Sequence, residues 1–175
     1  MRIAFISKLG SGKTTLADYL IKKHGYKRFS CAASLKDIAT MIGMVGKDRT
    51  LLQKLGFAIR KYDSYFFARN LVAAVGQEKN AVIDDVRYIE EYELLKGAGF
   101  IFVKKEVALP IRLKRLGELG IYPTEEQLNH DSEIHIDDLS FDHLISDETD
   151  KSIYSVTQEL EGILFFEKIK AGDTL

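Results

Sequence analysis

The sequence is short of cysteine, of proline and of any excess charge, and these shortages narrow the classes of protein that it can encode. One cysteine, Cys31, among 175 residues excludes an internal disulfide and a zinc site built from several cysteines. The 25 Lys and Arg residues nearly balance 26 Asp and Glu, which disfavours a strongly basic nucleic-acid-binding protein. No apolar run approaches the roughly 20 residues that span a bilayer, and the apolar start before Ser7 is too short for a signal peptide. We therefore expect a cytoplasmic protein with small-molecule partners and no membrane partner, whose oligomeric state the composition does not indicate.

Short apolar runs alternate with longer amphipathic stretches along the chain. Strands are predicted at residues 3–6, 26–30, 81–83, 100–103 and 143–145. Helices are predicted at 13–23, from 34 onward, in two pieces within 50–74, and at 88–96, 110–119 and 153–164. Ser34 with Asp37, and Thr124 with Gln127, have the spacing of capping boxes. This alternation, without repeats or linkers, predicts an α/β fold in which helices cover both faces of a parallel sheet, as a single domain over 1–175.

The stretch 7–15 is the most informative part of the sequence. Gly12, Lys13 and Thr14 form the end of the phosphate-loop pattern G-x-x-x-x-G-K-[ST], and Ser7 stands where the pattern has its first glycine. Two glycines remain to permit tight turns. A predicted strand precedes the stretch and a predicted helix follows it, as the pattern requires. We therefore expect a nucleoside triphosphate site rather than an ordinary Gly/Ser turn.

The residue types in this loop suit the binding of a nucleotide's phosphates. Successive N–H groups can wrap an anion, and the helix N-terminus adds its positive dipole. Lys13 supplies a mobile charge for the β- and γ-phosphates, Thr14 supplies a hydroxyl ligand for Mg²⁺, and Thr15 reaches the α-phosphate side. As the first residue of the helix, Lys13 is expected to be exposed before nucleotide binds. The predicted ATP-binding residues are Leu9, Gly10, Ser11, Gly12, Lys13, Thr14 and Thr15.

Further segments follow the loop in a definite order. They are 17–20, 29–36, 52–56 with Arg60, 83–87 with Glu91, and 130–133. The strand end Asp85-Val86-Arg87 and the segment His130-Asp131-Ser132-Glu133 are the most specific of them. Together they resemble the nucleoside monophosphate kinase group of phosphate-loop proteins, and most nearly its deoxynucleoside monophosphate kinases. The resemblance implies a parallel five-stranded sheet of the phosphate-loop NTPase type, an acceptor-binding helical region at 32–75 and a short lid-like segment at 108–130.

The resemblance also implies roles for three residues that end the second clear strand. Asp84 is implied to hold Mg²⁺ and substrate, and Asp85 is implied to be a catalytic carboxylate, because the ends of parallel strands border the ligand crevice. Arg87 is implied to bind the monophosphate, since its planar fork suits a phosphate group. Two alternatives stay open: Asp85 as a helix N-cap, and Arg87 in a surface ion pair with Glu90 or Glu91.

The helical region at 32–75 offers further basic residues for the acceptor. Arg60 follows Gly56 by one helical turn and is the expected anchor of the acceptor's phosphate. Lys36 is expected to face the same pocket, and Arg49 and Arg69 are weaker candidates. Simple solvation is the alternative for each of these basic side chains.

The lid interpretation depends on a short basic helix. Arg112 and Arg115 share one face of a helix that Pro110 opens. The resemblance implies that these arginines neutralise the transferring phosphoryl group and help to exclude water. A basic amphipathic helix without a partner is the alternative. His130 is interpreted as structural, and Glu133 has no assigned role.

The resemblance implies transfer of the γ-phosphoryl group of ATP, with Mg²⁺, to a nucleoside or deoxynucleoside 5′-monophosphate. The acceptor phosphate is already a nucleophile, so the protein needs only to position and neutralise it. The sequence accordingly shows no Ser/His/Asp or Cys/His set. The alternatives are a dephospho-coenzyme A kinase, another small-molecule phosphate-loop kinase, or a nucleotide-binding regulator without catalysis.

Overall fold

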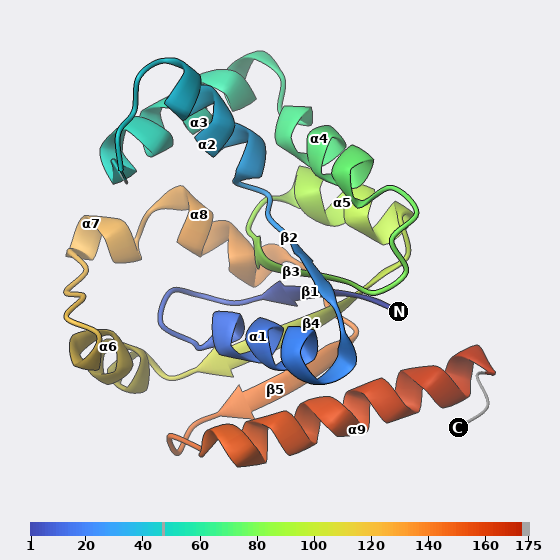
Figure 1. Ribbon diagram of the computed structural model, residues 1–175. Helices are drawn as coiled ribbons and strands as arrows, with labels where there is room; N and C mark the ends of the chain where they lie inside the picture. Colours follow the sequence, from blue (N-terminus) through green and yellow to red (C-terminus); the bar gives the residue numbers. More distant parts are fainter. Residues whose placement is uncertain (47, 173–175) are drawn as a thin grey trace.

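The computed structural model describes residues 1–46 and 48–172, apart from the side chains of Arg49, Asp131 and Ser132. Within these residues, five parallel strands form one sheet in the order β2-β3-β1-β4-β5 (Figure 1). The strands are β1 (Arg2–Ile6), β2 (Lys27–Phe29), β3 (Ala81–Val86), β4 (Phe100–Val107) and β5 (His143–Asp147). The predicted α/β fold and the five-stranded parallel sheet are both confirmed.

The helices surround this sheet. They are α1 (Lys13–His24), α2 (Ala33–Met41), α3 (Arg49–Tyr62), α4 (Phe66–Val75), α5 (Ile89–Gly97), α6 (Leu109–Glu118), α7 (Glu125–Leu128), α8 (Asp131–Ile134), the 3₁₀ helix η1 (His135–Asp138) and α9 (Ile153–Ala171). Helices α1 and α9 cover one face of the sheet, and α4 and α5 cover the other (Figure 1). Helices α2 and α3 stand above the sheet in Figure 1, where both contact α4.

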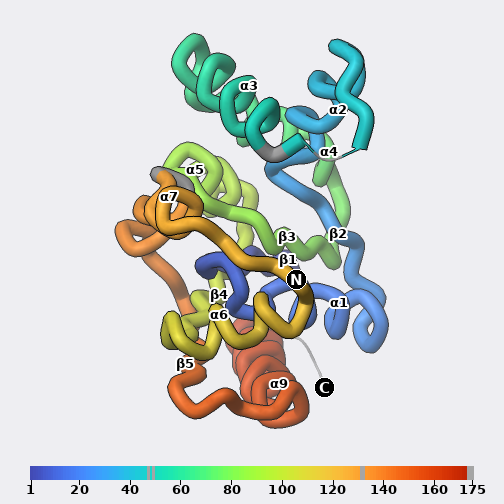
Figure 2. The backbone as a smooth tube through the Cα atoms, turned by 90° about the vertical axis from the view of Figure 1, so that its left-hand side faces the viewer, coloured from blue at the N-terminus to red at the C-terminus, as the bar shows by residue number. Residues whose placement is uncertain are grey.

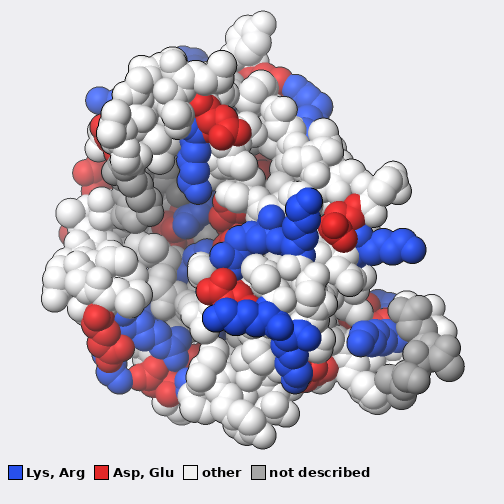
Figure 3. All heavy atoms as spheres, in the orientation of Figure 1, with Lys and Arg blue, Asp and Glu red and all other residues white. Residues whose placement is uncertain are grey.

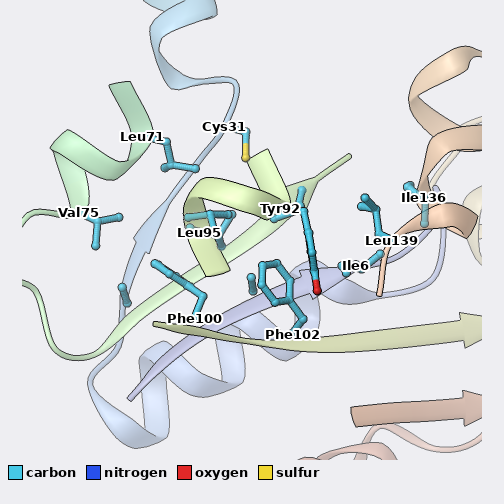
Figure 4. Close-up of a cluster of buried hydrophobic side chains, with 14 residues drawn as sticks. Ile6, Cys31, Leu71, Val75, Tyr92, Leu95, Phe100, Phe102, Ile136 and Leu139 are labelled. Atoms are coloured by element: carbon cyan, nitrogen blue, oxygen red, sulfur yellow. The ribbon is translucent and has the colours of Figure 1, made fainter. Parts of the chain in front are cut away.

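Two apolar cores hold these layers together. On the face of α1 and α9, the fully buried side chains of Phe5, Leu16 and Leu160 belong to one cluster. On the opposite face, Figure 4 shows Leu71 of α4 and Leu95 of α5 in the second cluster, near the aromatic residues of the sheet and α5. The rings of Tyr92 and Phe102 lie 4.4 Å apart there. Because apolar side chains cover β1, β3 and β4 on both faces, these strands read in the sequence as continuous apolar runs.

All five strands end at the same edge of the sheet, because all are parallel. The segment from α6 through α8 passes along this edge, as Figures 1 and 2 show from two sides. The loops after β1, β2, β3 and β5 also start there. In open α/β sheets, ligands bind at this edge.

Two local predictions need correction. The strand at 100–103 continues to Val107, because β5 extends its ladder through the charged residues Lys104 to Glu106. The predicted capping box at Ser34 is absent: α2 begins at Ala33, and no cap hydrogen bond comes from the N-cap residue's own side chain. The Asp85 carboxylate accepts from the N–H groups just before this helix instead. The capping box at Thr124 is confirmed.

Candidate functional site

The phosphate loop has the backbone shape that its sequence predicts. Gly10 and Gly12 have φ angles of 80° and 82°, a region that side chains disfavour. Gly12 is the N-cap of α1, and no side-chain hydrogen bond caps it. The first N–H groups of α1 can therefore face an anion. The Ser7 hydroxyl donates to the carbonyl oxygen of Lys105 at 2.7 Å, which explains a serine at the first position of the pattern.

Helix α6 packs directly on this loop. A Cβ atom at Gly10 would lie 2.9 Å from the Arg112 carbonyl oxygen and from the Leu116 side chain. The buried Arg112 guanidinium donates to the carbonyl oxygens of Leu9, at 3.0 Å, and Val107, at 3.2 Å. Arg112 therefore holds the loop in shape in this structure, and its action on a phosphoryl group stays a prediction. The lid interpretation of 108–130 also stays a prediction.

Lys13 is half-buried rather than exposed as expected. Its Nζ donates to the Lys8 carbonyl oxygen at 3.3 Å. Burial lowers the pKa of Lys13 to about 8, and the positive charge of Arg87 acts in the same direction, while Glu133 and Asp84 oppose the shift. The folded chain thus holds a poorly solvated cation in the loop, and a bound anion would stabilise its charged form.

The two carboxylates that end β3 have different surroundings. Asp85 accepts from the Ser30 hydroxyl at 2.6 Å and from the N–H groups of Cys31, at 2.8 Å, and Ala32, at 3.2 Å. It therefore ties β3 to the start of α2, and the N-cap alternative does not hold because α5 begins later, after Tyr88. Asp84 lies 3.9 Å from Arg28 Nε. A catalytic role for Asp85 stays a prediction, and the structure shows its carboxylate already engaged.

Arg60 and the buried carboxylate of Glu91 lie beside the end of β3. The Arg60 guanidinium lies 3.9 Å from the centre of the Tyr88 ring and donates to Glu91 at 3.4 Å. Gly56 makes room for it, because a Cβ there would lie 3.0 Å from Arg60 Nη1. Glu91 also accepts from the backbone N–H of Arg87 at 2.8 Å. Burial raises the pKa of Glu91, although these donors oppose the shift.

Glu133, which had no assigned role, lies in the middle of the site. Its carboxylate is 5% exposed, accepts from the Leu9 N–H at 2.8 Å, and forms an ion pair with Arg87. The predicted ion pair of Arg87 with Glu90 or Glu91 is thus replaced by a pair with a residue 46 positions away. The only sequence signal for this contact was the His-Asp-Ser-Glu segment itself. The side chains of its Asp131 and Ser132 lie outside the described part of the chain.

The two residues that Glu133 contacts, Leu9 and Arg87, line two different cavities. The first, of about 400 Å³, is called the loop cavity, and it is lined by Leu9, Gly10, Gly12, Lys13, Thr14, Thr15, Arg115, Leu116, Glu118 and Leu119. The second, of about 670 Å³, is called the helical cavity, and it is lined by Ala32, Leu35, Lys36, Leu52, Gln53, Phe57, Arg60, Lys61, Ser64, Arg87, Tyr88, Glu90, His130 and His135. Cations and anions are intermixed over the face shown in Figure 3, rather than gathered in one patch of single sign.

Most predicted site residues are brought together in this way. Six of the seven predicted ATP-binding residues line the loop cavity, and Lys36, Arg60 and Arg87 line the helical cavity. Ser11 is the exception: its N–H donates to the Lys8 carbonyl at 3.3 Å, and its buried hydroxyl has no partner among the described residues. Ser11 is fully buried and lines none of the cavities, so its predicted contact with ATP stays a prediction.

The other predicted arginines with described side chains, Arg115 and Arg69, do not line the helical cavity. Arg115 lines the loop cavity, but its guanidinium donates to Asp147 at 2.7 Å and to Asp150 at 2.7 Å. A smaller cavity of about 220 Å³ continues past Arg115 toward the start of α9. Arg69 is exposed, pairs with Asp63 and does not line the helical cavity. The Arg49 side chain lies outside the described part of the chain.

The oxygen atoms at the loop cavity suit a Mg²⁺ ion. Thr14 lines this cavity, and the negative charge of Asp84 acts on Lys13 beside it. Mg²⁺ takes few protein ligands and completes its shell with phosphate and water oxygens. The described side chains contain no cluster of three or more His, Cys, Asp or Glu that could hold a metal ion.

The chain shares its fold with solved phosphate-loop kinases. Shikimate kinase from Bacteroides thetaiotaomicron matches 94% of this chain and 98% of its own, with a TM-score of 0.58 and 16% identity. Shikimate kinase from Aquifex aeolicus matches 97% and 99%, also at a TM-score of 0.58 and 16% identity. A gluconokinase from Sinorhizobium meliloti matches 95% and 96%, with a TM-score of 0.52 and 13% identity. At these identities the likeness shows the fold.

Sequence similarity to known proteins is limited to part of the chain. No protein-family model matches the chain. An uncharacterized protein of Ictalurid herpesvirus 1, ORF77, is 30% identical over an alignment 106 positions long, and the match covers 55% of this chain. The match covers 46% of the viral protein, so the chain spans about half the length of this relative. Within the described residues, no helix has the combined length and apolar character that a bilayer crossing requires. The comparisons therefore show a fold shared with the two shikimate kinases and the gluconokinase, and no family.

Proposed function

We propose that the protein is an ATP-dependent kinase that transfers the γ-phosphoryl group to a nucleoside or deoxynucleoside 5′-monophosphate. The observation that carries the proposal is a pair of cavities, each lined by a residue that Glu133 contacts. Leu9 lines the loop cavity, Arg87 lines the helical cavity, and the Glu133 carboxylate contacts both. Two ligands seated in these cavities would meet near this carboxylate.

The loop cavity is the proposed ATP site. It combines the N–H groups at the start of α1, the Lys13 ammonium and the Thr14 hydroxyl. N–H groups and a cation stabilise the phosphates without reorganisation. Thr14 and Asp84 are the residues proposed to hold Mg²⁺, which would neutralise charge on the β- and γ-phosphates.

The helical cavity is the proposed acceptor site. Its lining is mainly apolar, from Leu35, Leu52 and Phe57 among others, which suits the flat faces of a nucleobase. Arg60 and Arg87 enter it from different elements, α3 and the end of β3, and both suit a phosphate group. A phosphate acceptor needs no general base, which agrees with the engagement of Asp85 in three hydrogen bonds.

A second candidate is a kinase with a hydroxyl or carboxylate-bearing acceptor. The fold neighbours named as shikimate kinase and gluconokinase favour it, because they show that this fold is used by kinases named for small non-nucleotide molecules. A hydroxyl acceptor would need a carboxylate base, and Asp84 is the residue whose carboxylate is the less engaged of the two that end β3.

ADP release from ATP and Mg²⁺, measured against a panel of acceptors, tests the proposal. The panel contains ribo- and deoxyribonucleoside 5′-monophosphates with each base, dephospho-coenzyme A, shikimate and gluconate. We expect turnover with at least one monophosphate and none with shikimate or gluconate. Turnover with a non-nucleotide acceptor alone would select the second candidate. ATP binding without turnover on any acceptor would point to a regulator.

A further inference from the structure

The Glu133 carboxylate is bound by two groups, a backbone N–H and an arginine, that would also suit a phosphate. One carboxylate oxygen accepts from a phosphate-loop N–H, that of Leu9, at 2.8 Å, and the other pairs with Arg87. The charge of Glu133 also acts on Lys13 and on Arg112. One cation, Arg87, and one N–H group therefore contact the carboxylate of a residue that is 5% exposed, and two further cations feel its charge. This is the environment of an anion-binding site with its anion supplied by the chain.

This carboxylate contacts one lining residue of each cavity, Leu9 of the loop cavity and Arg87 of the helical cavity. Resting on the proposed function, the Leu9 side belongs to the ATP site and Arg87 to the acceptor site. A γ-phosphoryl group in transit between them would use the same N–H group and the same guanidinium. A phosphate and a carboxylate at one point repel each other, because both carry negative charge and the site is poorly solvated. The two groups therefore cannot both stay there in ionised form.

We propose that Glu133 is a resident anion that occupies the phosphoryl-transfer point before nucleotides bind, and that nucleotide binding displaces it. Displacement moves Glu133 away from both Leu9 and Arg87. Because Glu133 is on α8, and His130 and His135 on either side of it line the helical cavity, its departure also changes the wall of the acceptor site. ATP that displaces Glu133 thus prepares Arg87 for the acceptor, which gives positive coupling between the two ligands.

The test compares binding of adenylyl imidodiphosphate, a non-hydrolysable ATP analogue, with Mg²⁺ by isothermal titration calorimetry. Glu133→Gln removes the negative charge at nearly constant shape, and Glu133→Ala removes the contacts altogether. Glu93→Gln is the matched control, because Glu93 is an exposed acid of α5 that lines neither cavity. We expect both Glu133 variants to bind the analogue about tenfold more tightly than the unmodified protein, since binding no longer breaks charge-assisted hydrogen bonds. The control should be unchanged.

Hydrogen exchange gives the second readout. In the unmodified protein, the analogue should speed amide exchange over 130–138, and in Glu133→Gln this segment should exchange rapidly from the start. Equal or weaker binding by both Glu133 variants, or equal tightening in the control, would overturn the inference while leaving the proposed function standing. No analogue binding by any of the proteins, the unmodified one included, would overturn the proposed function, and this inference with it.

Discussion

At the scale of single residues, two lysines with lowered pKa, Lys13 and Lys105, are expected to have different roles. Lys13 borders the loop cavity, where a phosphate can compensate its poor solvation. Lys105 is 4% exposed, and no hydrogen bond or ion pair joins its ammonium to another described residue. Burial lowers the pKa of Lys105 to about 8, and the charge of Arg115 acts in the same direction. The first lysine is therefore expected to matter for activity and the second for stability.

Lys13→Ala should abolish phosphoryl transfer while leaving the fold intact. The substitution removes the cation proposed to meet the β- and γ-phosphates. Within the described residues its ammonium makes one hydrogen bond, to the Lys8 carbonyl, which is long at 3.3 Å. Turnover and thermal unfolding are measured on the same preparation. Comparable ATP turnover in the variant would contradict the assignment of the loop as the ATP site.

Lys105→Met should stabilise the protein at pH 7 and flatten its pH dependence. Between the folded pKa of about 8 and the ordinary value of 10.5, the unfolded chain binds more protons than the folded chain. Below pH 8, the charged Lys105 therefore lowers the free energy of unfolding of the unmodified protein by an amount on the order of 2–3 kcal/mol. This loss disappears as the pH rises from 8 to 10.5. Urea titrations of both proteins at pH 7 and pH 10 measure this change in the free energy of unfolding.

The neighbouring lysine supplies the control for that measurement. Lys104→Met removes a buried lysine of the same strand whose ammonium is paired with Glu106 at 3.0 Å. The rise in stability with pH should persist in this control. An unchanged rise in Lys105→Met as well would show that the Lys105 ammonium is not the cause.

At the residue scale, the sequence predicted contacts that are local and missed those that are distant. The loop residues 9–15 act through their own backbone and a helix N-terminus, so their pattern carries its chemistry. The partners of Arg87 and Asp85 come from segments 46 and 53–55 positions away. No spacing rule reports such pairs, because they depend on how β3, α2 and α8 meet at the edge of the sheet.

At the scale of elements, the contact between α6 and the phosphate loop is the most specific feature. Gly10 lies under α6, at a positive φ and with no space for a Cβ atom. The sequence predicted α6 from its proline and its periodicity, but its packing on the loop is a tertiary contact that no local pattern reveals. The same holds for β4, whose last residues are strand only because β5 pairs with them.

Gly10→Ala should destabilise the protein more than Gly25→Ala does. Both glycines have positive φ, 80° and 68°, but a Cβ at Gly25 meets nothing within 4 Å. The Gly25 variant should lose about 1 kcal/mol from backbone strain alone. The Gly10 variant should lose several kcal/mol and most of its ATP affinity, because α6 must also shift. Equal losses in denaturant titrations would show that α6 does not pack on the loop in solution.

Arg112→Ala should weaken ATP binding through the shape of the loop. Its guanidinium donates to the carbonyl oxygens of Leu9 and Val107, so its loss should also cost about 1.5–3 kcal/mol of unfolding free energy. Calorimetric titration with the non-hydrolysable analogue and a denaturant titration measure the two effects. A fall in turnover number alone, with unchanged stability and ATP affinity, would instead favour the lid role implied by the resemblance.

At the scale of the whole molecule, two separate cavities are linked by the contacts of Glu133 with one lining residue of each. The sheet edge presents the loop cavity, and the region of α2 and α3 that stands above the sheet presents the helical cavity. The strand–helix alternation and the phosphate loop predicted the fold and the place of the loop cavity. The acceptor-binding region at 32–75 was implied by the resemblance and stays a prediction. Neither predicted that Glu133 would contact residues of both cavities.

Arg60→Ala should weaken monophosphate binding by about 10- to 100-fold and leave ATP affinity nearly unchanged. The residue lines the helical cavity but not the loop cavity, and a charge-assisted hydrogen bond has about this value. Arg69→Ala is the matched control, because Arg69 is an exposed arginine outside the helical cavity. Equal losses for the two nucleotides, or an equal effect in the control, would remove Arg60 from the acceptor site.

The central claim is direct transfer of phosphate between nucleotides in the two cavities, and ³¹P NMR of the reaction tests it most directly. The protein is incubated with ATP, Mg²⁺ and a nucleoside 5′-monophosphate, with Lys13→Ala as the control. Our account predicts that the γ-phosphorus signal of ATP falls as the β-phosphorus signal of a new nucleoside diphosphate grows in equal amount, with no inorganic phosphate in between and no change in the control. Inorganic phosphate as the sole product, or unchanged ATP with every monophosphate, would contradict it.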